Sequence, residues 1–265
     1  MNLLQSVIIA IVEGLTEFLP VSSTGHMILA QGFLGVKSDD FVKAFTVIIQ
    51  FGAILSVLVL YWKRFWQSWN FYRKLLIAFI PAAVIGFLAG DFIDSLLENV
   101  VVIAIMLIAG GFFMLFVDKW FAHSEKNELQ AMTDANAFKI GLAQCVAMIP
   151  GVSRSMATIV GGMAQKFSRR AAAEFSFFLA VPTMAAAAGY KLLKLLMNGE
   201  SRQVLADNMN ILIIGNIVAF IVAMLAIKFF IDFLTKYGFK AFGWYRIVAG
   251  LVILSLSLFG FHLEV

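Results

Sequence analysis

The sequence has little of what a soluble protein is rich in. Only 14% of its 265 residues are charged and 62% are hydrophobic, whereas a soluble domain carries roughly 25% charged residues. Its one cysteine, Cys145, excludes an intramolecular disulfide and offers no metal-binding cysteine spacing. The N-terminus has no basic stretch, so we expect no cleavable signal peptide. The composition therefore predicts a polytopic membrane protein.

Six stretches are long and apolar enough to cross a bilayer, which takes about 20 helical residues. They are roughly 42–62, 73–90, 100–118, 171–192, 209–231 and 243–262. Two further segments, 3–35 and 138–166, each consist of two short apolar arms joined by a proline and a Ser/Gly-rich tip. Neither arm is long enough to cross, so we expect two re-entrant hairpins, with two kinked full spans as the alternative. The predicted fold is an all-α polytopic membrane protein with six transmembrane helices and two re-entrant helical hairpins.

The charges of the loops predict the orientation, because basic loops stay in the cytoplasm. The acidic 90–99 loop lies outside in this scheme, and so does 190–208, although that loop also contains lysines. The cytoplasmic loops are 62–75, 118–139, 165–170 and 228–246, the last with Lys228, Lys236, Lys240 and Arg246. Both termini are then periplasmic. The single membrane domain has two halves, about 1–118 and 138–265. Each half has an odd number of spans, which makes the halves an inverted-topology repeat.

The two hairpin segments resemble each other. The first contains Glu13, Glu17 and the run Pro-Val-Ser-Ser-Thr-Gly-His that ends at His26. The second runs from Gln144 through Pro-Gly-Val-Ser-Arg-Ser to Thr158, and aligning the two Val-Ser pairs sets Glu13 against Gln144. Inverted repeats with broken helices place their site near the bilayer midplane, between the repeats. We therefore expect the two tips to meet in the middle of the protein.

Glu13 and Glu17 are four residues apart and so share one face of a helix. Two carboxylates on one face suit a hard divalent cation such as Mg²⁺, or a general base with a charged neighbour. The competing interpretation is an exposed helix face at the membrane border. The strongly apolar residues around them favour a site.

Hydroxyl groups gather directly after the first proline. Ser22, Ser23 and Thr24 can cap a helix there, or they can bind phosphate together with the N–H groups of a helix N-terminus. His26 follows and can act as an acid or a base, and a structural role for it is equally open.

Arg154 stands between two serines in the second tip. A buried arginine needs an anion, and its guanidinium binds phosphate in bidentate fashion, although an ion pair with Glu13 or Glu17 is the alternative. We predict an anion site suited to phosphoryl chemistry. The hydroxyl ligands expected beside Arg154 are Ser22, Thr24, Ser153, Ser155 and Thr158. Because we see no soluble domain, we expect a lipid phosphate as the substrate.

These motifs resemble those of the bacterial undecaprenyl-diphosphate phosphatases, the BacA/UppP family linked to bacitracin resistance. The family's first motif is matched by Glu13, Glu17 and Pro20 through His26, and its second by the segment from Pro150 to Thr158. The similarity covers essentially the whole chain. It implies hydrolysis of undecaprenyl diphosphate to undecaprenyl phosphate and inorganic phosphate, which recycles the lipid carrier for peptidoglycan and other envelope polymers.

The resemblance also implies roles for single residues. Glu13 and Glu17 correspond to carboxylates that hold a metal or act as bases, and Arg154 corresponds to the diphosphate clamp. Ser23 and His26 match a proposed nucleophile and its partner. Water is the alternative nucleophile, and we favour Ser23 because His26 lies only three residues further on.

The resemblance further implies a cofactor and a location. The cofactor is a divalent cation, with Mg²⁺ the first candidate and Ca²⁺ the second. The location is the bacterial inner membrane, with the site accessible from the periplasm. The partners are the membrane and its polyprenyl diphosphate lipid; no nucleic acid is expected, and a homodimer is open.

A second class of function has the same general features. Inverted repeats with anion sites at the midplane are also typical of transporters. The alternative function is therefore a transporter or flippase of an anionic lipid or small anion. Phosphate release by purified protein in detergent separates the two classes, because transport needs a sealed membrane.

Overall fold

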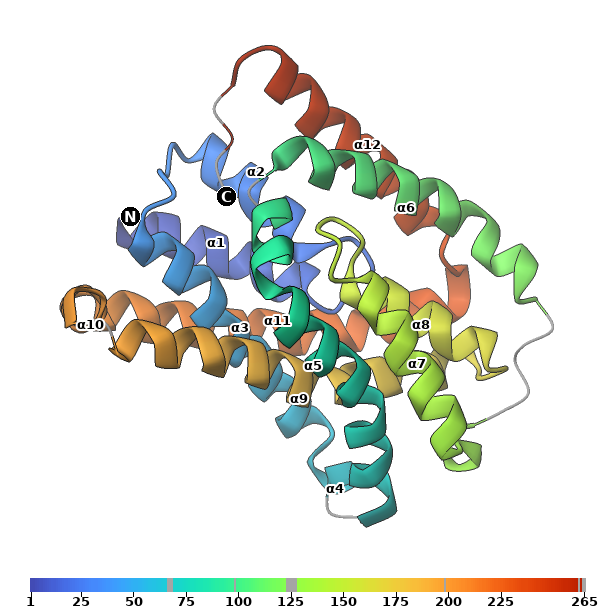
Figure 1. Ribbon diagram of the computed structural model, residues 1–265. Coiled ribbons are helices and arrows are strands. Elements are labelled where there is room, and N and C mark those ends of the chain that lie inside the picture. Colours follow the sequence, from blue (N-terminus) through green and yellow to red (C-terminus); the bar gives the residue numbers. More distant parts are fainter. Residues whose placement is uncertain (66–68, 98, 123–127, 198, 262, 264–265) are drawn as a thin grey trace.

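The computed structural model describes every residue from 1 to 265 except 66–68, 98, 123–127, 198, 262 and 264–265. The described part of the chain is almost entirely helical (Figure 1). Its α-helices are α1 (Leu3–Thr16), α2 (Ser23–Phe33), α3 (Asp40–Leu60), α4 (Trp62–Phe65), α5 (Trp69–Leu97), α6 (Val100–Trp120), α7 (Asp134–Val146), α8 (Arg154–Ala164), α9 (Arg169–Met197), α10 (Gly199–Asp207), α11 (Met209–Tyr237) and α12 (Lys240–Leu258). A short 3₁₀ helix, η1 (Leu129–Ala131), precedes α7.

Among the described residues, six helices are long and apolar enough to cross a membrane: α3, α5 as far as Gly90, α6, α9, α11 and α12. This confirms the prediction of six spans. The second span starts at Trp69 and not at residue 73, and its apolar part covers 22 residues. Large apolar side chains on the outside, such as Phe87 at 87% exposed and Phe229 at 62%, suit a lipid surrounding. The chain is a multi-pass membrane protein.

The two predicted hairpins are pairs of short helices. α1 packs against α2 and α7 against α8, and the longest of the four, α1, has 14 residues. Both α1 and α7 begin with a capping box, formed by Asn2 with Gln5 and by Thr133 with Asn136. The two boxes stand at equivalent positions of the aligned segments. The depth of the hairpins in the bilayer stays a prediction.

Each hairpin turns through an unusual backbone conformation. Ser22 has a φ of 71° and Ser153 a φ of 76°, values that residues other than glycine rarely adopt. Both serines are the N-cap residues of the returning helices, α2 and α8. Pro20 and Pro150 precede them at the points where the incoming helices have ended. The two tips are therefore alike in backbone as well as in sequence.

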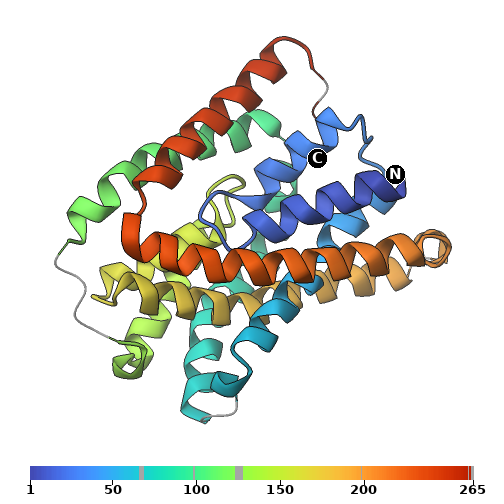
Figure 2. The ribbon, with the colours of Figure 1, turned by 180° about the vertical axis from the view of Figure 1, so that it is seen from behind.

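Helices of the first half pack between helices of the second. α1 packs along α11 and α7 along α5, while α3 packs against α9. Small residues permit these contacts: a Cβ on Gly14 would lie 2.8 Å from the carbonyl oxygen of Ala219, and one on Gly141 would collide with the carbonyl oxygen of Ala78. Figures 1 and 2 show the two hairpin tips together at the centre of the molecule.

The packing of α6 against α12 is reciprocal. A Cβ on Gly111 would lie 2.7 Å from the carbonyl oxygen of Gly243, and a Cβ on Gly243 would lie 2.9 Å from the carbonyl oxygen of Gly111. The two helices therefore touch backbone to backbone at this pair of glycines.

Two of the predicted loops are largely helical. In the 190–208 stretch, α9 continues to Met197, with Lys191 and Lys194 at helical spacing among leucines, and α10 covers Gly199–Asp207. The 228–246 stretch is also mostly helix, since α11 reaches Tyr237 and α12 begins at Lys240. Arg246, which the loop argument counts as a cytoplasmic charge, lies inside α12 and is completely buried. One basic residue fewer therefore supports a cytoplasmic position for the 228–246 stretch.

Candidate active site

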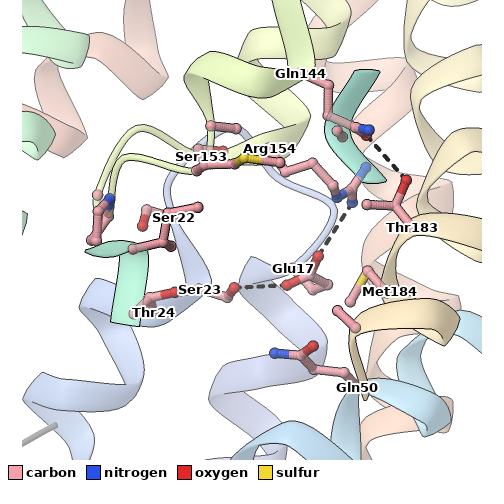
Figure 3. Close-up of a pocket in the computed structure, with 17 residues that line it drawn as sticks. Glu17, Ser22, Ser23, Thr24, Gln50, Gln144, Ser153, Arg154, Thr183 and Met184 are labelled. Carbon is pink, nitrogen blue, oxygen red and sulfur yellow. Dashed lines mark hydrogen bonds and ion pairs between the residues drawn. The ribbon is translucent and has the colours of Figure 1, made fainter. Parts of the chain in front are cut away.

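A cavity of about 310 Å³ lies where the two tips meet (Figure 3). Its polar lining comes from both hairpins, from α3 and from α9, and consists of Glu17, Ser22, Ser23, Thr24, Gln50, Gln144, Ser153, Arg154 and Thr183. An apolar wall is formed by residues that include Ala82 and Ile93 of α5 and Met184 and Ala187 of α9. The cavity thus offers a polar end and an apolar flank.

The two tips contact each other directly, as the sequence predicts. The Ser155 hydroxyl of the second tip donates a hydrogen bond to the Leu19 carbonyl of the first, with an oxygen–oxygen distance of 2.7 Å. Arg154 forms an ion pair with Glu17, with 3.2 Å between Nη2 and Oε1. The sequence motifs from the two halves therefore build one site.

Glu17 connects a hydroxyl group with a guanidinium. Its Oε2 accepts a hydrogen bond from the Ser23 hydroxyl at 2.7 Å, and its Oε1 faces Arg154. The side chains of Glu17 and Arg154 are 8% and 13% exposed, so both charges are largely shielded from solvent. A carboxylate held this close to a hydroxyl can take its proton.

Arg154 has one nitrogen without a hydrogen-bond partner. Its Nη1 donates to the carbonyl of Ser176 on α9 at 3.0 Å, while its buried Nε has no hydrogen-bond partner among the described residues. Thr158 supports this arrangement, since its hydroxyl hydrogen-bonds the Ser176 hydroxyl at 2.6 Å and the Arg154 carbonyl at 2.8 Å. A buried unpaired donor is unfavourable until it meets an acceptor. An anion in the cavity can provide that acceptor.

His26 does not pair with Ser23. Its Nδ1 lies 2.8 Å from the Ser22 carbonyl and its Nε2 lies 2.7 Å from the Tyr245 hydroxyl. A carbonyl only accepts, so Nδ1 carries the proton, and the free lone pair of a neutral His26 at Nε2 accepts from Tyr245. His26 is also outside the cavity lining. The structure brings Ser23 to Glu17 instead of bringing it to His26.

Glu13 lies one helical turn before Glu17 and is completely buried. Neither of its carboxylate oxygens has a hydrogen-bond partner in the described part of the chain. Its repeat counterpart, Gln144, accepts a 3.3 Å hydrogen bond from Thr183 and leaves its buried Nε2 unpaired. Both positions therefore keep unused polar atoms beside the cavity.

A metal ion would find few protein ligands here. Within the described residues, no group of three or more His, Cys, Asp or Glu side chains could hold one. The unpartnered oxygens of Glu13 and the carboxylate of Glu17 still form a fitting pair of hard donors. Mg²⁺ is often bound by one or two carboxylates together with substrate phosphates.

The sequence-predicted residues fall into two groups. Glu17, Ser22, Ser23, Thr24, Ser153 and Arg154 line the cavity, whereas Glu13, His26, Ser155 and Thr158 lie behind it. Sequence reasoning missed Gln50 and Thr183 in the lining, as well as Ser176 and Tyr245 behind it. Gln50 and Ser176 are polar residues inside predicted spans, which is a signal that could have found them.

A known protein family matches nearly the whole chain. Residues 6–252 match the family described as "Bacitracin resistance protein BacA". The chain belongs to the BacA family. This confirms the resemblance that the two hairpin motifs carry.

Three relatives, each named undecaprenyl-diphosphatase, are similar over nearly their full lengths. The one from Flavobacterium johnsoniae is 60% identical over 260 residues, covering 98% of this chain and 97% of the relative. The one from Porphyromonas gingivalis is 56% identical over 284 residues and 100% of both chains. The one from Aquifex aeolicus is 45% identical over 260 residues, covering 96% of this chain and 98% of the relative.

Proposed function

We propose that this BacA-family protein hydrolyses undecaprenyl diphosphate to undecaprenyl phosphate and inorganic phosphate. The observation that carries the proposal is the linked set Ser23, Glu17 and Arg154 beside one cavity, at the contact between the two hairpin tips. The names of the relatives support it. The reaction regenerates the lipid carrier for peptidoglycan and other envelope polymers, and it confers resistance to bacitracin.

The polar end of the cavity receives the diphosphate. Arg154 contributes its guanidinium, including the unpaired Nε, and stands at the N-terminus of α8, where backbone N–H groups favour anions. The hydroxyls of Ser22, Thr24 and Ser153 line the same space and add hydrogen bonds. The apolar wall of α5 and α9 residues borders the prenyl chain.

Ser23 is the nucleophile in this proposal and Glu17 its base. The Ser23 hydroxyl gives its proton to Glu17 and attacks the terminal phosphorus, and the bond from that phosphorus to the bridging oxygen breaks. Undecaprenyl phosphate leaves with the bridging oxygen. Water then attacks the phosphorus of the phosphoserine and the bond from that phosphorus to the Ser23 oxygen breaks. The Ser23 oxygen takes back its proton from Glu17, and inorganic phosphate leaves with the protons of the water. His26, held by Ser22 and Tyr245, supports the turn and takes no proton from Ser23.

We also propose a divalent cation, with Mg²⁺ first and Ca²⁺ second. Glu13 and Glu17 would hold it, and the buried unpartnered oxygens of Glu13 support this assignment. A cation bound there would neutralise charge on the diphosphate.

The proposed setting is the inner membrane, with an inverted repeat, periplasmic termini and a site open to the periplasm. Three features support the repeat: the paired capping boxes of α1 and α7, the left-handed serines of the two tips, and the reciprocal packing of α6 with α12. Basic residues on the 62–75 segment support the orientation.

Phosphate release from undecaprenyl diphosphate by the purified protein in detergent tests the function. We compare the wild type with Glu17→Gln and with Glu128→Gln. Glu128 is the exposed N-cap residue of η1, so its variant is a control with the same chemical change. Wild type and Glu128→Gln should release phosphate equally, while Glu17→Gln should lose activity by about 10³-fold, since it removes the proposed base and the partner of Arg154. An inactive wild type that moves anions across sealed vesicles would establish the transporter instead.

A further inference from the structure

Arg246 is the most completely buried large polar side chain that the proposed chemistry leaves without a role. It belongs to α12, within the last of the six spans, and its relative exposure is 0%. Burying a guanidinium is unfavourable unless its hydrogen bonds are satisfied. The contacts of Arg246 therefore indicate what this charge is for.

The guanidinium donates five hydrogen bonds, and among the described residues all its acceptors are backbone carbonyls. The acceptors, with their distances, are Gly151 (2.7 Å) and Met106 (3.1 Å) from Nη2, Val152 (3.0 Å) and Pro20 (3.2 Å) from Nη1, and Leu107 (3.4 Å) from Nε. An arginine has five N–H donors, so its capacity is fully used. These carbonyls come from three places: the first tip, the second tip and α6.

The positions of these acceptors show which segments Arg246 holds together. Pro20 lies just before Ser22, and Val152 directly precedes Ser153, the two residues with left-handed backbone. Carbonyls in such irregular turns have no helical partner and need donors when they are buried. Arg246 supplies donors to both turns at once and fixes each against the other and against α6.

We infer that Arg246 is a positioning residue for the phosphatase reaction. It holds the two tips so that Ser23 and Glu17 of the first face Arg154 of the second. It touches no residue of the Ser23–Glu17–Arg154 set through its own hydrogen bonds, so its effect on catalysis acts through the backbone of the tips. This inference rests on the proposed function.

Gly110 offers an independent way to disturb the same contact. A Cβ at this position would collide with Nη2 of Arg246, whereas a Cβ at Gly189 of α9 would meet no atom within 4 Å. Gly110→Ala should therefore push the guanidinium off its carbonyls, and Gly189→Ala is a matched control with the same chemical change.

The experiment compares wild type, Arg246→Lys, Arg246→Met, Gly110→Ala and Gly189→Ala. Each is purified as a monodisperse peak, and kcat and KM for phosphate release are measured per folded molecule. Lysine has three donors on one atom and cannot serve three segments. We expect kcat to fall about 100-fold in the Gly110→Ala and Arg246→Lys proteins, the scale for a misplacement of about 1 Å. We expect KM to change less than about threefold, and Gly189→Ala to match the wild type.

Every result decides the inference. A purely structural role would reduce the yield of folded protein and leave kcat per folded molecule unchanged, which overturns positioning. If no Arg246 variant folds, Gly110→Ala decides alone. If it also fails to fold while Gly189→Ala folds, the role is structural and the inference is wrong. An inactive wild type would contradict the proposed function, which is a separate result from active wild type with equally active variants.

Discussion

The two hairpin tips have similar backbone conformations but carry different functional side chains. Ser22 and Ser153 have nearly the same φ and cap equivalent helices. The residues after them differ, Ser23 in the first tip and Arg154 in the second. The capping differs too, because the Ser153 hydroxyl accepts from the Met156 amide at 3.3 Å and Ser22 makes no such bond. Two tips with similar backbone conformations can therefore carry different parts of one site. The first supplies the carboxylate and the hydroxyl, and the second supplies the cation.

The largest effect should separate two serines, one in each tip. Ser23→Ala should lower kcat by a factor on the order of 10⁴ or more if Ser23 is the nucleophile. Ser153→Ala removes an N-cap and one hydroxyl of the lining, and it should cost about 1 kcal/mol of stability and only a several-fold loss of turnover. Phosphate release by both purified proteins measures the difference.

If water attacks instead, Ser23→Ala should lose only about 10- to 1,000-fold, the scale of one transition-state donor. Trapping a phosphoserine during turnover would sharpen the assignment. A Ser23→Ala protein with turnover near that of Ser153→Ala would remove the chemical difference between the tips.

Arg154→Ala should lose about 10³-fold in kcat/KM, because the second tip then has no cation for the diphosphate. Arg154→Lys should also be poor, since it keeps the charge and loses the bidentate fork. Arg73→Ala is the control, because Arg73 forms a surface ion pair with Asp134 and is 56% exposed. Near-normal turnover by Arg154→Lys would contradict the clamp.

Glu13→Gln makes the first tip resemble the second, where Gln144 already stands. We expect a loss of about 10- to 100-fold, with a higher Mg²⁺ concentration needed for half-maximal activity, because one hard donor is removed. Glu17→Gln should lose more activity and weaken the metal dependence further, since Glu17 also faces Ser23 and Arg154. Metal titrations of the three proteins test this, and equal curves for wild type and Glu17→Gln would remove the metal assignment.

The smallest effect on activity is expected for the cysteine substitutions that test the membrane topology. In a Cys145→Ser background, Ser95→Cys and Glu128→Cys should both keep normal activity. An impermeant thiol reagent on intact spheroplasts should label residue 95 and leave residue 128 unlabelled. The reverse pattern would mean that the whole protein is flipped, and labelling of both would break the six-span arrangement.

Much of the fold was open to prediction from sequence. The six spans follow from apolar runs, and the two tips from prolines and hydroxyl residues inside an apolar chain. The prediction was wrong where it took a basic residue as evidence of a loop position. The sequence places Arg246 among the basic loop residues. In the structure it is completely buried and donates hydrogen bonds to five backbone carbonyls of distant segments. Such a set of acceptors exists only after the two tips have folded together.

The sequence predicted which residues belong to the site better than it predicted which of them contact each other. Ser23, Glu17 and Arg154 are all in the motifs, but the pairing of Ser23 with His26 rested on their closeness along the chain. Tyr245, more than 200 residues away in sequence, satisfies the His26 ring instead. Spacing cannot reveal a partner that comes from the last helix.

The contact between Gly111 and Gly243 has a consequence for the symmetry of the molecule. Each glycine meets the backbone of the other, which is the kind of contact that two identical chains make across a two-fold axis. A pair of helices joined in this way behaves as a dimer interface inside one polypeptide. In the proposed inverted repeat, this contact lies where the two-fold axis between the halves would pass, so one side chain added at either glycine would separate both helices at their point of symmetry.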